Sequence, residues 1–430
     1  MGLGRFPARP VRDPGGLLMG FDIADARPLG FDPARLARID RFLAETYIGP
    51  GKLPQAQILV ARDGQAVHFG QYGHLRADGT PMREDALLRL ASMTKPVTSV
   101  AFMQLVEQAR VALDDPVARV LPELANLGVY AGGGGAVPFA PATPTRPLRF
   151  VDLLTHMSGL TYGLQNRTSV DAAYRAIEFD FGREHHTSDE YLAHLGQLPL
   201  EFEPGTGWNY SVATDVLGIA VERLSGMRLG DYFREHIFAP LGMADTGFDV
   251  APGGSERLAD CWAYQPGRPP KLVDRGADSK LLHPAKFNSG GGGLIGTIGD
   301  YHRFARMLLG KGELDGARVL APKTLALMTS NFLPGGADLA SISQSLFSES
   351  TSAGMGFGLG FAMVIDPAKT LMPASLGEFY WGGAYSTAFF VDPLEGITMV
   401  FTTQLYPSSA YPVRRQLKTL IYAALTDSRA

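Results

Sequence analysis

The chain has little cysteine, no long apolar run and no excess of positive charge. Its 430 residues include one cysteine, Cys261, which excludes an internal disulfide framework and a cysteine-based zinc cluster. No stretch of about 18 or more apolar residues occurs, so no segment is predicted to span a membrane. Asp and Glu outnumber Lys and Arg by 43 to 39, so neither nucleic acid nor an anionic membrane is an expected partner.

Features of secretion and of metal binding are also missing. Residues 1–20 contain scattered arginines and prolines without an apolar core, which is unlike a secretory signal, so we predict a cytoplasmic protein. Two adjacent histidines, His185 and His186, would point to different faces of any regular element. We therefore expect no metal and no organic cofactor.

What the sequence does contain is a serine and a lysine at a chemically useful spacing. Ser92 and Lys95 lie three residues apart at the predicted start of a helix, so their side chains share one face. Lys95 alone among the nine lysines has a serine three residues before it, and its apolar surroundings indicate a buried helix. A neighbouring base can remove the proton of a serine hydroxyl, so the pattern indicates an activated nucleophile rather than a solvated helix start.

Two further segments are candidates for the same site. Tyr210 follows a Pro-Gly turn at a predicted helix start and is a candidate proton relay for Lys95, although most tyrosines are ordinary buried aromatics. The segment 381–384, Trp-Gly-Gly-Ala, precedes a predicted strand. Glycines there permit close approach to the backbone, and acyl transfer needs N–H donors at the developing oxyanion. Taken alone, the glycines indicate a bulge or bend equally well.

Strand patterns cluster at the two ends of the chain, with helical patterns between them. The dipeptide Asp63-Gly64 is typical of a two-residue hairpin turn. We expect an α+β fold, with one antiparallel sheet built from both ends and covered by terminal helices. The predicted helices at the two ends are about 33–47 and 412–425, and the predicted strands are 57–62, 65–70, 358–365, 386–391 and 397–403.

The same pattern predicts two domains. The first is a discontinuous sheet domain, residues 1–91 and 288–430, which begins with an irregular arm at 1–28. The second is a mostly helical domain, residues 92–287, in which Gly/Pro-rich loops interrupt the helical patterns.

Together these motifs resemble the active-site set of the serine β-lactamase and penicillin-binding-protein superfamily. The resemblance is strongest to its class C-like esterase branch, the family VIII carboxylesterases, and covers most of the chain. The order and separation of Ser92 and Tyr210 also match. Further matching tracts are 153–160, 204–211, 240–243, 291–294, 297–300 and 356–360.

The resemblance implies a β-lactamase-like fold with the active site in the cleft between the sheet and the helical domain. It implies that Ser92 is the acylated nucleophile and that Lys95 and Tyr210 share the general acid–base work. It also implies an oxyanion hole made by the backbone N–H groups of Ser92 and Ala384.

Other residues are expected to contact the substrate, and we expect Trp381 and Tyr162 to form walls of its pocket. His156 is expected to have a structural role. The residues expected to bind substrate are Trp381, Gly382, Gly383 and Tyr162.

Two departures from the superfamily pattern favour esters over β-lactams. Trp381-Gly382-Gly383 stands where β-lactamases and peptidases usually carry Lys-Thr-Gly, so the cation and hydroxyl for a substrate carboxylate are missing. Val212 stands at the Asn position of Tyr-x-Asn and cannot hydrogen-bond an amide. We therefore expect a serine carboxylesterase acting on neutral, apolar esters with short acyl chains, with slow β-lactam hydrolysis as a side activity.

Two alternatives stay open. A class C-like β-lactamase or D-amino-acid peptidase would hydrolyse nitrocefin or D-Ala-D-Ala peptides efficiently, and a noncatalytic penicillin-binding-like scaffold would hydrolyse nothing. No serine has the Gly-x-Ser-x-Gly context of an α/β-hydrolase elbow. The expected partner is a small-molecule ester, and the sequence does not fix an oligomeric state.

Overall fold

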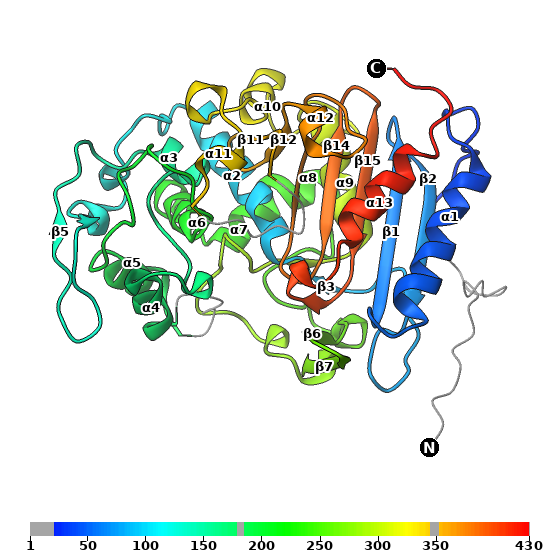
Figure 1. The fold of residues 1–430 in the computed structure, drawn as a ribbon, viewed down its shortest axis with the longest axis horizontal. Coiled ribbons are helices and arrows are strands. Elements are labelled where there is room, and N and C mark those ends of the chain that lie inside the picture. Colours follow the sequence, from blue (N-terminus) through cyan, green and yellow to red (C-terminus); the bar gives the residue numbers. More distant parts are fainter. Residues whose placement is uncertain (1–20, 179–184, 345–351, 430) are drawn as a thin grey trace.

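One antiparallel sheet joins the two ends of the chain. The computed structural model describes residues 21–178, 185–344 and 352–429. Within them, seven strands form a sheet in the order β11-β12-β13-β14-β15-β1-β2 (Figure 1). These strands are β1 (Gln55–Arg62), β2 (Gln65–Gly73), β11 (Met355–Phe357), β12 (Ala362–Val364), β13 (Phe379–Gly382), β14 (Ala388–Asp392) and β15 (Ile397–Thr402).

The N-terminal hairpin enters the sheet by pairing β1 with β15. Val60 lies opposite Met399 in an antiparallel register. Asp63 and Gly64 at the hairpin turn have φ values of 51° and 77°, as a two-residue turn of this kind requires, so the predicted hairpin is confirmed. The predicted α+β fold, with an antiparallel sheet drawn from both ends, is confirmed as well.

Each face of the sheet has its own hydrophobic core, because side chains alternate along a strand. Phe390 and Met399 pack on the face covered by α1 (Pro33–Leu43) and α13 (Val413–Tyr422) (Figure 1). Phe389 and Val400 pack on the other face, against the core that contains α2 (Thr94–Glu107) and α9 (Ile298–Leu309). The two terminal helices therefore form one outer layer, and α2 is buried behind the sheet.

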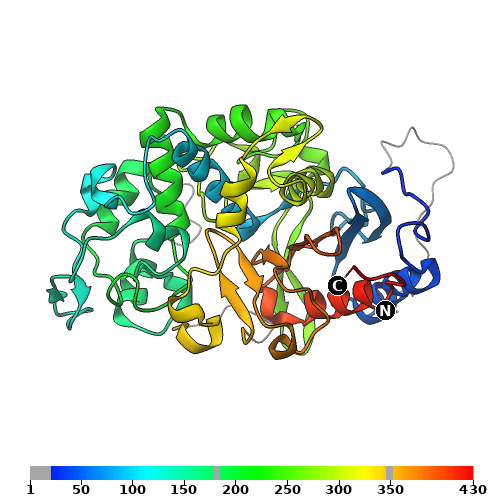
Figure 2. The same ribbon diagram turned by 90° about the horizontal axis from the view of Figure 1, so that it is seen from above.

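A group of helices lies at the end of the molecule away from α1 and α13 (Figures 1 and 2). Two of them begin with capping boxes, at Thr168 and Thr187. No helix of the described ranges is long and apolar enough to cross a membrane. The helices between α2 and α9 in the chain are α3 (Phe150–Leu154), α4 (Ser169–Ala176), α5 (Ser188–Leu195), α6 (Ala213–Ser225), α7 (Leu229–Phe233) and α8 (Ala239–Leu241).

Shorter elements connect these layers. Three helices precede or interrupt the last part of the sheet: α10 (Pro322–Met328), α11 (Leu339–Ile342) and α12 (Pro367–Thr370). The short strand pairs are β3 (Leu88–Arg89) with β8 (Ile295–Gly296), β4 (Val129–Tyr130) with β5 (Pro141–Ala142), and β9 (Glu313–Leu314) with β10 (Ala317–Arg318). A three-stranded sheet places β6 (Cys261–Gln265) between β7 (Arg268–Asp274) and β16 (Leu405–Tyr406).

The predicted single strand at 358–365 is wrong. The chain turns back there, so that β11 and β12 form a hairpin. Gly360 has a φ of 92°, which residues other than glycine rarely adopt, and the Gly358 N–H donates to the Phe361 carbonyl at 2.8 Å. The alternation of apolar residues on both sides of the glycines resembles one strand, whereas the glycines make the turn between two.

The 381–384 segment precedes a strand, as predicted, because β14 begins at Ala388. Its first two residues, Trp381 and Gly382, are also the end of another strand, β13, which the sequence pattern did not indicate. The region predicted to be mostly helical also contains the β6–β7 hairpin, whose alternating pattern is interrupted by two shifts of register. The boundaries of the two predicted domains stay a prediction, and residues 1–20 of the predicted arm lie outside the described residues.

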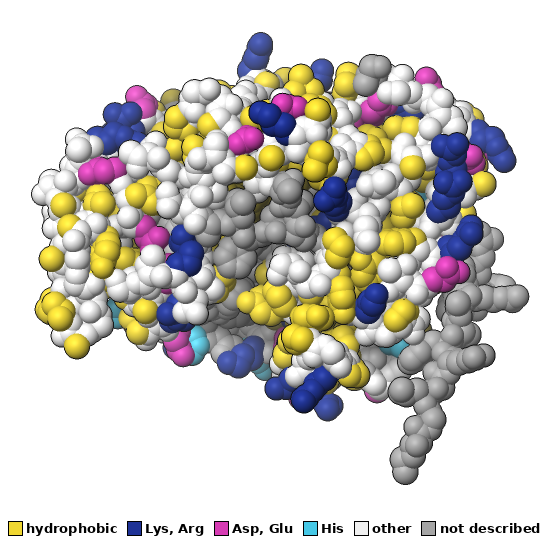
Figure 3. Space-filling view, in the orientation of Figure 1, with side chains coloured by type: hydrophobic (Ala, Val, Ile, Leu, Met, Phe, Trp, Pro, Cys, Tyr) yellow, Lys and Arg dark blue, Asp and Glu magenta, His cyan; other side chains and the backbone are white. Residues whose placement is uncertain are grey.

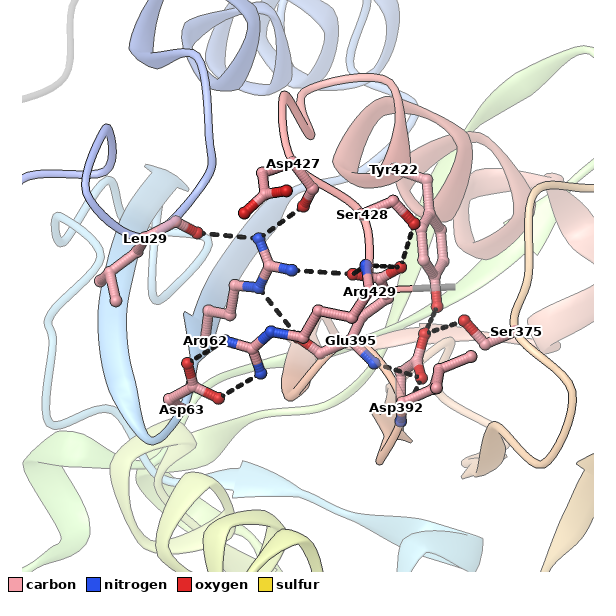
Figure 4. A network of polar contacts seen from close by, with 11 residues as sticks. Leu29, Arg62, Asp63, Ser375, Asp392, Glu395, Tyr422, Asp427, Ser428 and Arg429 are labelled. Atoms are coloured by element: carbon pink, nitrogen blue, oxygen red, sulfur yellow. Dashed lines mark hydrogen bonds and ion pairs between the residues drawn. The ribbon is translucent and has the colours of Figure 1, made fainter.

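A buried polar network ties the C-terminus to the sheet (Figure 4). Arg62 at the end of β1 donates to the Glu395 carboxylate at 2.8 Å and to the backbone carbonyls of Leu29 and Asp427. Glu395 in turn accepts from the backbone N–H of Arg429 at 3.1 Å. We call the labelled residues of Figure 4 the C-terminal network: Leu29, Arg62, Asp63, Ser375, Asp392, Glu395, Tyr422, Asp427, Ser428 and Arg429.

Candidate active site

Ser92 lies in a 3₁₀ turn, Ala91–Met93, that leads directly into α2. Ala91 has a φ of 48°, a left-handed conformation that costs a non-glycine residue about 1–2 kcal/mol. The turn is held in place from α9, because the Tyr301 hydroxyl donates to the Met93 carbonyl at 2.9 Å. Strain next to a half-buried serine is typical of a functional position rather than of a plain helix start.

Lys95 lies buried behind Ser92 and is 2% exposed. Its Nζ donates to Ser92 Oγ at 3.4 Å, to the Tyr162 hydroxyl at 3.0 Å and to the Gly291 carbonyl at 2.6 Å. The structure therefore brings together the two residues of the Ser-x-x-Lys pattern. A base within hydrogen-bond reach of a serine hydroxyl is the arrangement that nucleophilic catalysis requires.

Two tyrosines enclose the Lys95 amine. Lys95 Nζ lies 4.6 Å from the ring centroid of Tyr210 and 5.4 Å from that of Tyr162. The two rings are 5.4 Å apart. Tyr210 also packs against Trp381, with a centroid distance of 5.5 Å. Tyr162, predicted only as a pocket wall, is thus a direct hydrogen-bonding partner of Lys95.

The backbone explains why Tyr162 and Tyr210 meet. The segment before α6 runs alongside the segment after α3: the Asn209 N–H donates to the His156 carbonyl at 2.9 Å, and the Val212 N–H donates to the Thr161 carbonyl at 3.2 Å. Two tracts quoted from the sequence, 153–160 and 204–211, are therefore neighbours in space. Their pairing places Tyr162 beside Tyr210.

His156 is buried in the same cluster. Its Nδ1 lies 3.1 Å from Ser211 Oγ, and its ring packs 5.0 Å from that of Tyr210. Burial lowers the pKa of His156 well below its ordinary value, and the positive charge of Lys95 lowers it further. His156 thus packs against Tyr210 as a neutral imidazole, which agrees with a structural role.

Sequence reasoning missed Asp215, a buried carboxylate on α6. Its Oδ1 accepts from Ser289 Oγ at 2.5 Å and from the Gly291 N–H at 3.0 Å. Burial raises the pKa of Asp215, while the charge of Lys95 and these two hydrogen bonds act in the opposite direction. Because the Gly291 carbonyl accepts from Lys95, a single residue links the two groups. An acidic residue in the otherwise apolar start of α6 was the signal available in the sequence.

The 381–384 segment lies against the turn that holds Ser92. The Gly383 N–H donates to the Thr387 carbonyl at 2.8 Å, and Thr387 Oγ1 donates to the Leu90 carbonyl at 3.2 Å. No backbone hydrogen bond outside the helices and strands of the described ranges uses the Ala384 N–H. An N–H without a backbone partner in this place is suited to a ligand oxygen.

Ser92, Tyr162 and Tyr210 line a cavity of about 960 Å³. The space-filling view shows a hollow near the centre of the face it draws (Figure 3). A cavity of this size accommodates a drug-sized molecule. Val212, by contrast, is fully buried at the start of α6. The predicted site residues on the cavity wall are Ser92, Tyr162, Tyr210, Trp381, Gly382, Gly383 and Ala384.

Known proteins with similar sequences span nearly the whole chain. A family model described as Beta-lactamase matches residues 41–423. Esterase EstB of Burkholderia gladioli is 32% identical over 427 residues, which cover 93% of this chain and 98% of that protein. An uncharacterized protein of Mycobacterium tuberculosis is 37% identical over 365 residues, 83% of this chain and 87% of its own length.

A solved structure with a similar fold also matches most of the chain. It is that of EstCE1, described as a hydrolase with promiscuous acyltransferase activity. It is 26% identical, has a TM-score of 0.75, and covers 92% of this chain and 99% of its own.

Proposed function

The chain belongs to the Beta-lactamase family of serine hydrolases, and we propose that it is a carboxylesterase that cleaves esters with short acyl chains. The family membership confirms the resemblance predicted from the sequence motifs. The contact set of Lys95, with Ser92 Oγ and the Tyr162 hydroxyl in hydrogen-bond reach, carries the proposal of nucleophilic catalysis. The similarity to an esterase over nearly the full length of both proteins supports an ester as the substrate.

In the proposed first half-reaction, Ser92 Oγ attacks the ester carbonyl carbon while its proton passes to the neutral amine of Lys95. The tetrahedral oxyanion is held by the backbone N–H groups of Ser92 and Ala384. The bond between the carbonyl carbon and the alcohol oxygen then breaks, and the alcohol leaves with the proton, which Lys95 passes on through Tyr210 as it becomes neutral again. An acyl group stays on Ser92.

In the second half-reaction, water replaces the alcohol. It gives its proton to Lys95 or Tyr210 as it attacks the acyl carbon, and the bond to Ser92 Oγ breaks as that oxygen regains a proton. Tyr162 holds the Lys95 amine in place through both steps. The cycle consumes one ester and one water and releases one alcohol and one carboxylic acid.

The preference for esters rests on the residues at the end of β13. Trp381 presents an aromatic wall to the cavity, packed 5.4 Å from the ring of Phe357, where β-lactamases usually carry a lysine. Val212 is buried and supplies no amide for a β-lactam side chain. Both features favour an apolar group next to the scissile bond.

The test compares substrates on the wild type and on Ser92→Ala. We expect turnover of p-nitrophenyl acetate and butyrate to exceed that of the octanoate, of nitrocefin and of a D-Ala-D-Ala peptide. Ser92→Ala should reduce ester turnover to background without a change in melting temperature. Faster hydrolysis of nitrocefin or of the peptide would assign the chain to the β-lactamase or peptidase alternative. Wild-type turnover in Ser92→Ala would remove the proposed nucleophile.

A further inference from the structure

Arg414, on the C-terminal helix α13, reaches the backbone next to the proposed oxyanion hole. Its Nη2 donates to the Gly383 carbonyl at 2.6 Å. The same carbonyl accepts from the Ser386 N–H at 3.0 Å, within the turn that follows β13. A charged donor and a backbone donor thus fix one carbonyl oxygen on the cavity wall.

The two glycines of the 381–384 segment make this contact possible. A Cβ at Gly382 would lie 2.8 Å from Arg414 Cζ, in the space that the guanidinium occupies. A Cβ at Gly383 would lie 2.4 Å from the Leu90 carbonyl, two residues before Ser92. One glycine therefore admits the guanidinium, and the other lets the strand approach the backbone that leads to the nucleophile.

The carbonyl of Gly383 and the N–H of Ala384 belong to one peptide group. A donor at the oxygen of an amide draws electron density from its nitrogen, which strengthens the N–H as a donor, and a charged donor does so more than a neutral one. Two bonds to the oxygen also fix the direction in which the N–H points. Any substrate oxygen bound by Ala384 would therefore meet a preorganised donor.

We infer that Arg414 is a positioning residue that orients and polarises the Gly383–Ala384 peptide for the oxyanion. The inference rests on the proposed function, because it assumes an acyl-enzyme whose carbonyl lies in that hole. Arg414 acts through the peptide and touches no reacting atom. A positive charge, which the Trp-Gly-Gly sequence lacks at its first position, is thereby supplied next to this segment from the C-terminal helix α13.

A different role for Arg414 makes a different prediction. Arg414 also lines the cavity, where a guanidinium is suited to bind a carboxylate of the substrate. In that case its loss would raise KM for esters that carry a carboxylate and leave neutral esters unchanged. In the positioning role its loss lowers kcat for neutral esters with KM unchanged, because acylation and deacylation use the same oxyanion hole.

The experiment uses Arg414→Met, Arg414→Lys and the matched control Arg415→Met. Arg415 is the next residue on α13, and its guanidinium donates to the Leu371 carbonyl at 3.1 Å. Rates are measured with p-nitrophenyl butyrate and with a p-nitrophenyl ester that has a terminal carboxylate. The acyl-enzyme is then formed from a ¹³C-carbonyl ester and its carbonyl stretching frequency is recorded by infrared difference spectroscopy.

We expect Arg414→Met to lower kcat for the neutral ester about tenfold at unchanged KM and to shift the acyl carbonyl to higher frequency. Arg414→Lys should recover part of both effects, and Arg415→Met should show neither. A loss of kcat at an unchanged carbonyl frequency, or an effect confined to KM of the anionic ester, would overturn the inference while Ser92 still became acylated. If Ser92 in the wild type is not acylated, the proposed function itself fails.

Discussion

Two buried cations in this protein have opposite surroundings. Arg62, in the C-terminal network, is 1% exposed and donates to a carboxylate as well as to backbone carbonyls (Figure 4). Lys95, 2% exposed, donates to a serine hydroxyl, a tyrosine hydroxyl and one carbonyl. Among the described residues no carboxylate lies within ion-pair distance of Lys95, and Asp215 is connected to it only through the Gly291 backbone.

The difference separates a structural charge from a reactive one. A buried cation paired with a carboxylate has a fixed charge, because loss of its proton would leave the carboxylate alone in a low dielectric. A lysine among neutral oxygens can lose its proton and become a neutral amine without leaving an unpaired carboxylate, and a neutral amine can act as a base. Changes near Lys95 should therefore affect turnover, whereas loss of the buried Arg62–Glu395 pair should affect stability.

The largest expected effect is that of Lys95→Met on turnover. Removal of the proposed base should lower kcat for p-nitrophenyl butyrate about ten-thousandfold, as for other residues that activate a nucleophile. The melting temperature should change little, because the nearby buried Asp215 keeps its hydrogen bonds from Ser289 and Gly291 when the amine is replaced by an apolar side chain. A loss of less than tenfold, or a clear drop in melting temperature, would contradict the contrast drawn between the two cations.

The next effect is that of Arg62→Met on stability. Loss of the guanidinium leaves the buried Glu395 carboxylate without its partner, so the free energy of unfolding in urea should fall by about 3–5 kcal/mol. The matched control is Arg429→Met, because Arg429 forms an exposed pair with Asp63 whose loss should cost less than about 1 kcal/mol. In both variants the folded enzyme should keep its kcat. Equal losses of stability would show that burial does not distinguish the two pairs.

A third buried group, His302 on α9, belongs to neither cluster. Burial lowers its pKa to about 3, with Arg306 and Arg303 contributing in the same direction. The folded protein therefore binds this proton less tightly than the unfolded chain, and its contribution to stability is lost as the pH falls from about 6.5 toward 3. Between about pH 6.5 and pH 5, His302→Gln should lose roughly 2 kcal/mol less of its free energy of unfolding than the wild type does. Parallel stability curves of variant and wild type in urea would refute the burial argument.

The last prediction compares the two tyrosines. Tyr162→Phe removes a hydroxyl that holds the Lys95 amine and should lower kcat about tenfold. Tyr210→Phe removes the proposed donor to the leaving alcohol and should lower kcat about a hundredfold to a thousandfold. Steady-state rates with p-nitrophenyl butyrate check both. A larger loss in Tyr162→Phe would exchange the roles assigned to the two residues.

The sequence indicates much of this arrangement where the signal is local. The Asp63-Gly64 turn and the terminal helices follow from turn chemistry and periodicity, and Ser92 and Lys95 meet because they are one turn apart. The hairpin at 355–364 was not predicted, because its apolar pattern resembles one strand although two glycines interrupt it.

The contacts that define the site come from distant parts of the chain. Tyr162 reaches Lys95 because the segment after α3 pairs with the segment before α6, and no spacing in the sequence encodes that pairing. Asp215 and Arg414 lie on other helices again, and each reaches the site through a backbone carbonyl or N–H. Backbone partners carry no residue-type signal, so sequence patterns cannot predict them.

The most direct test of the account is the intact mass of the enzyme during turnover of p-nitrophenyl butyrate, quenched in acid and followed by peptide mapping. The account predicts one butyryl group per chain, on Ser92, more of it in Tyr210→Phe if deacylation slows, and none in Ser92→Ala. Turnover without any adduct on Ser92, or an adduct on another residue that persists in Ser92→Ala, would contradict the account.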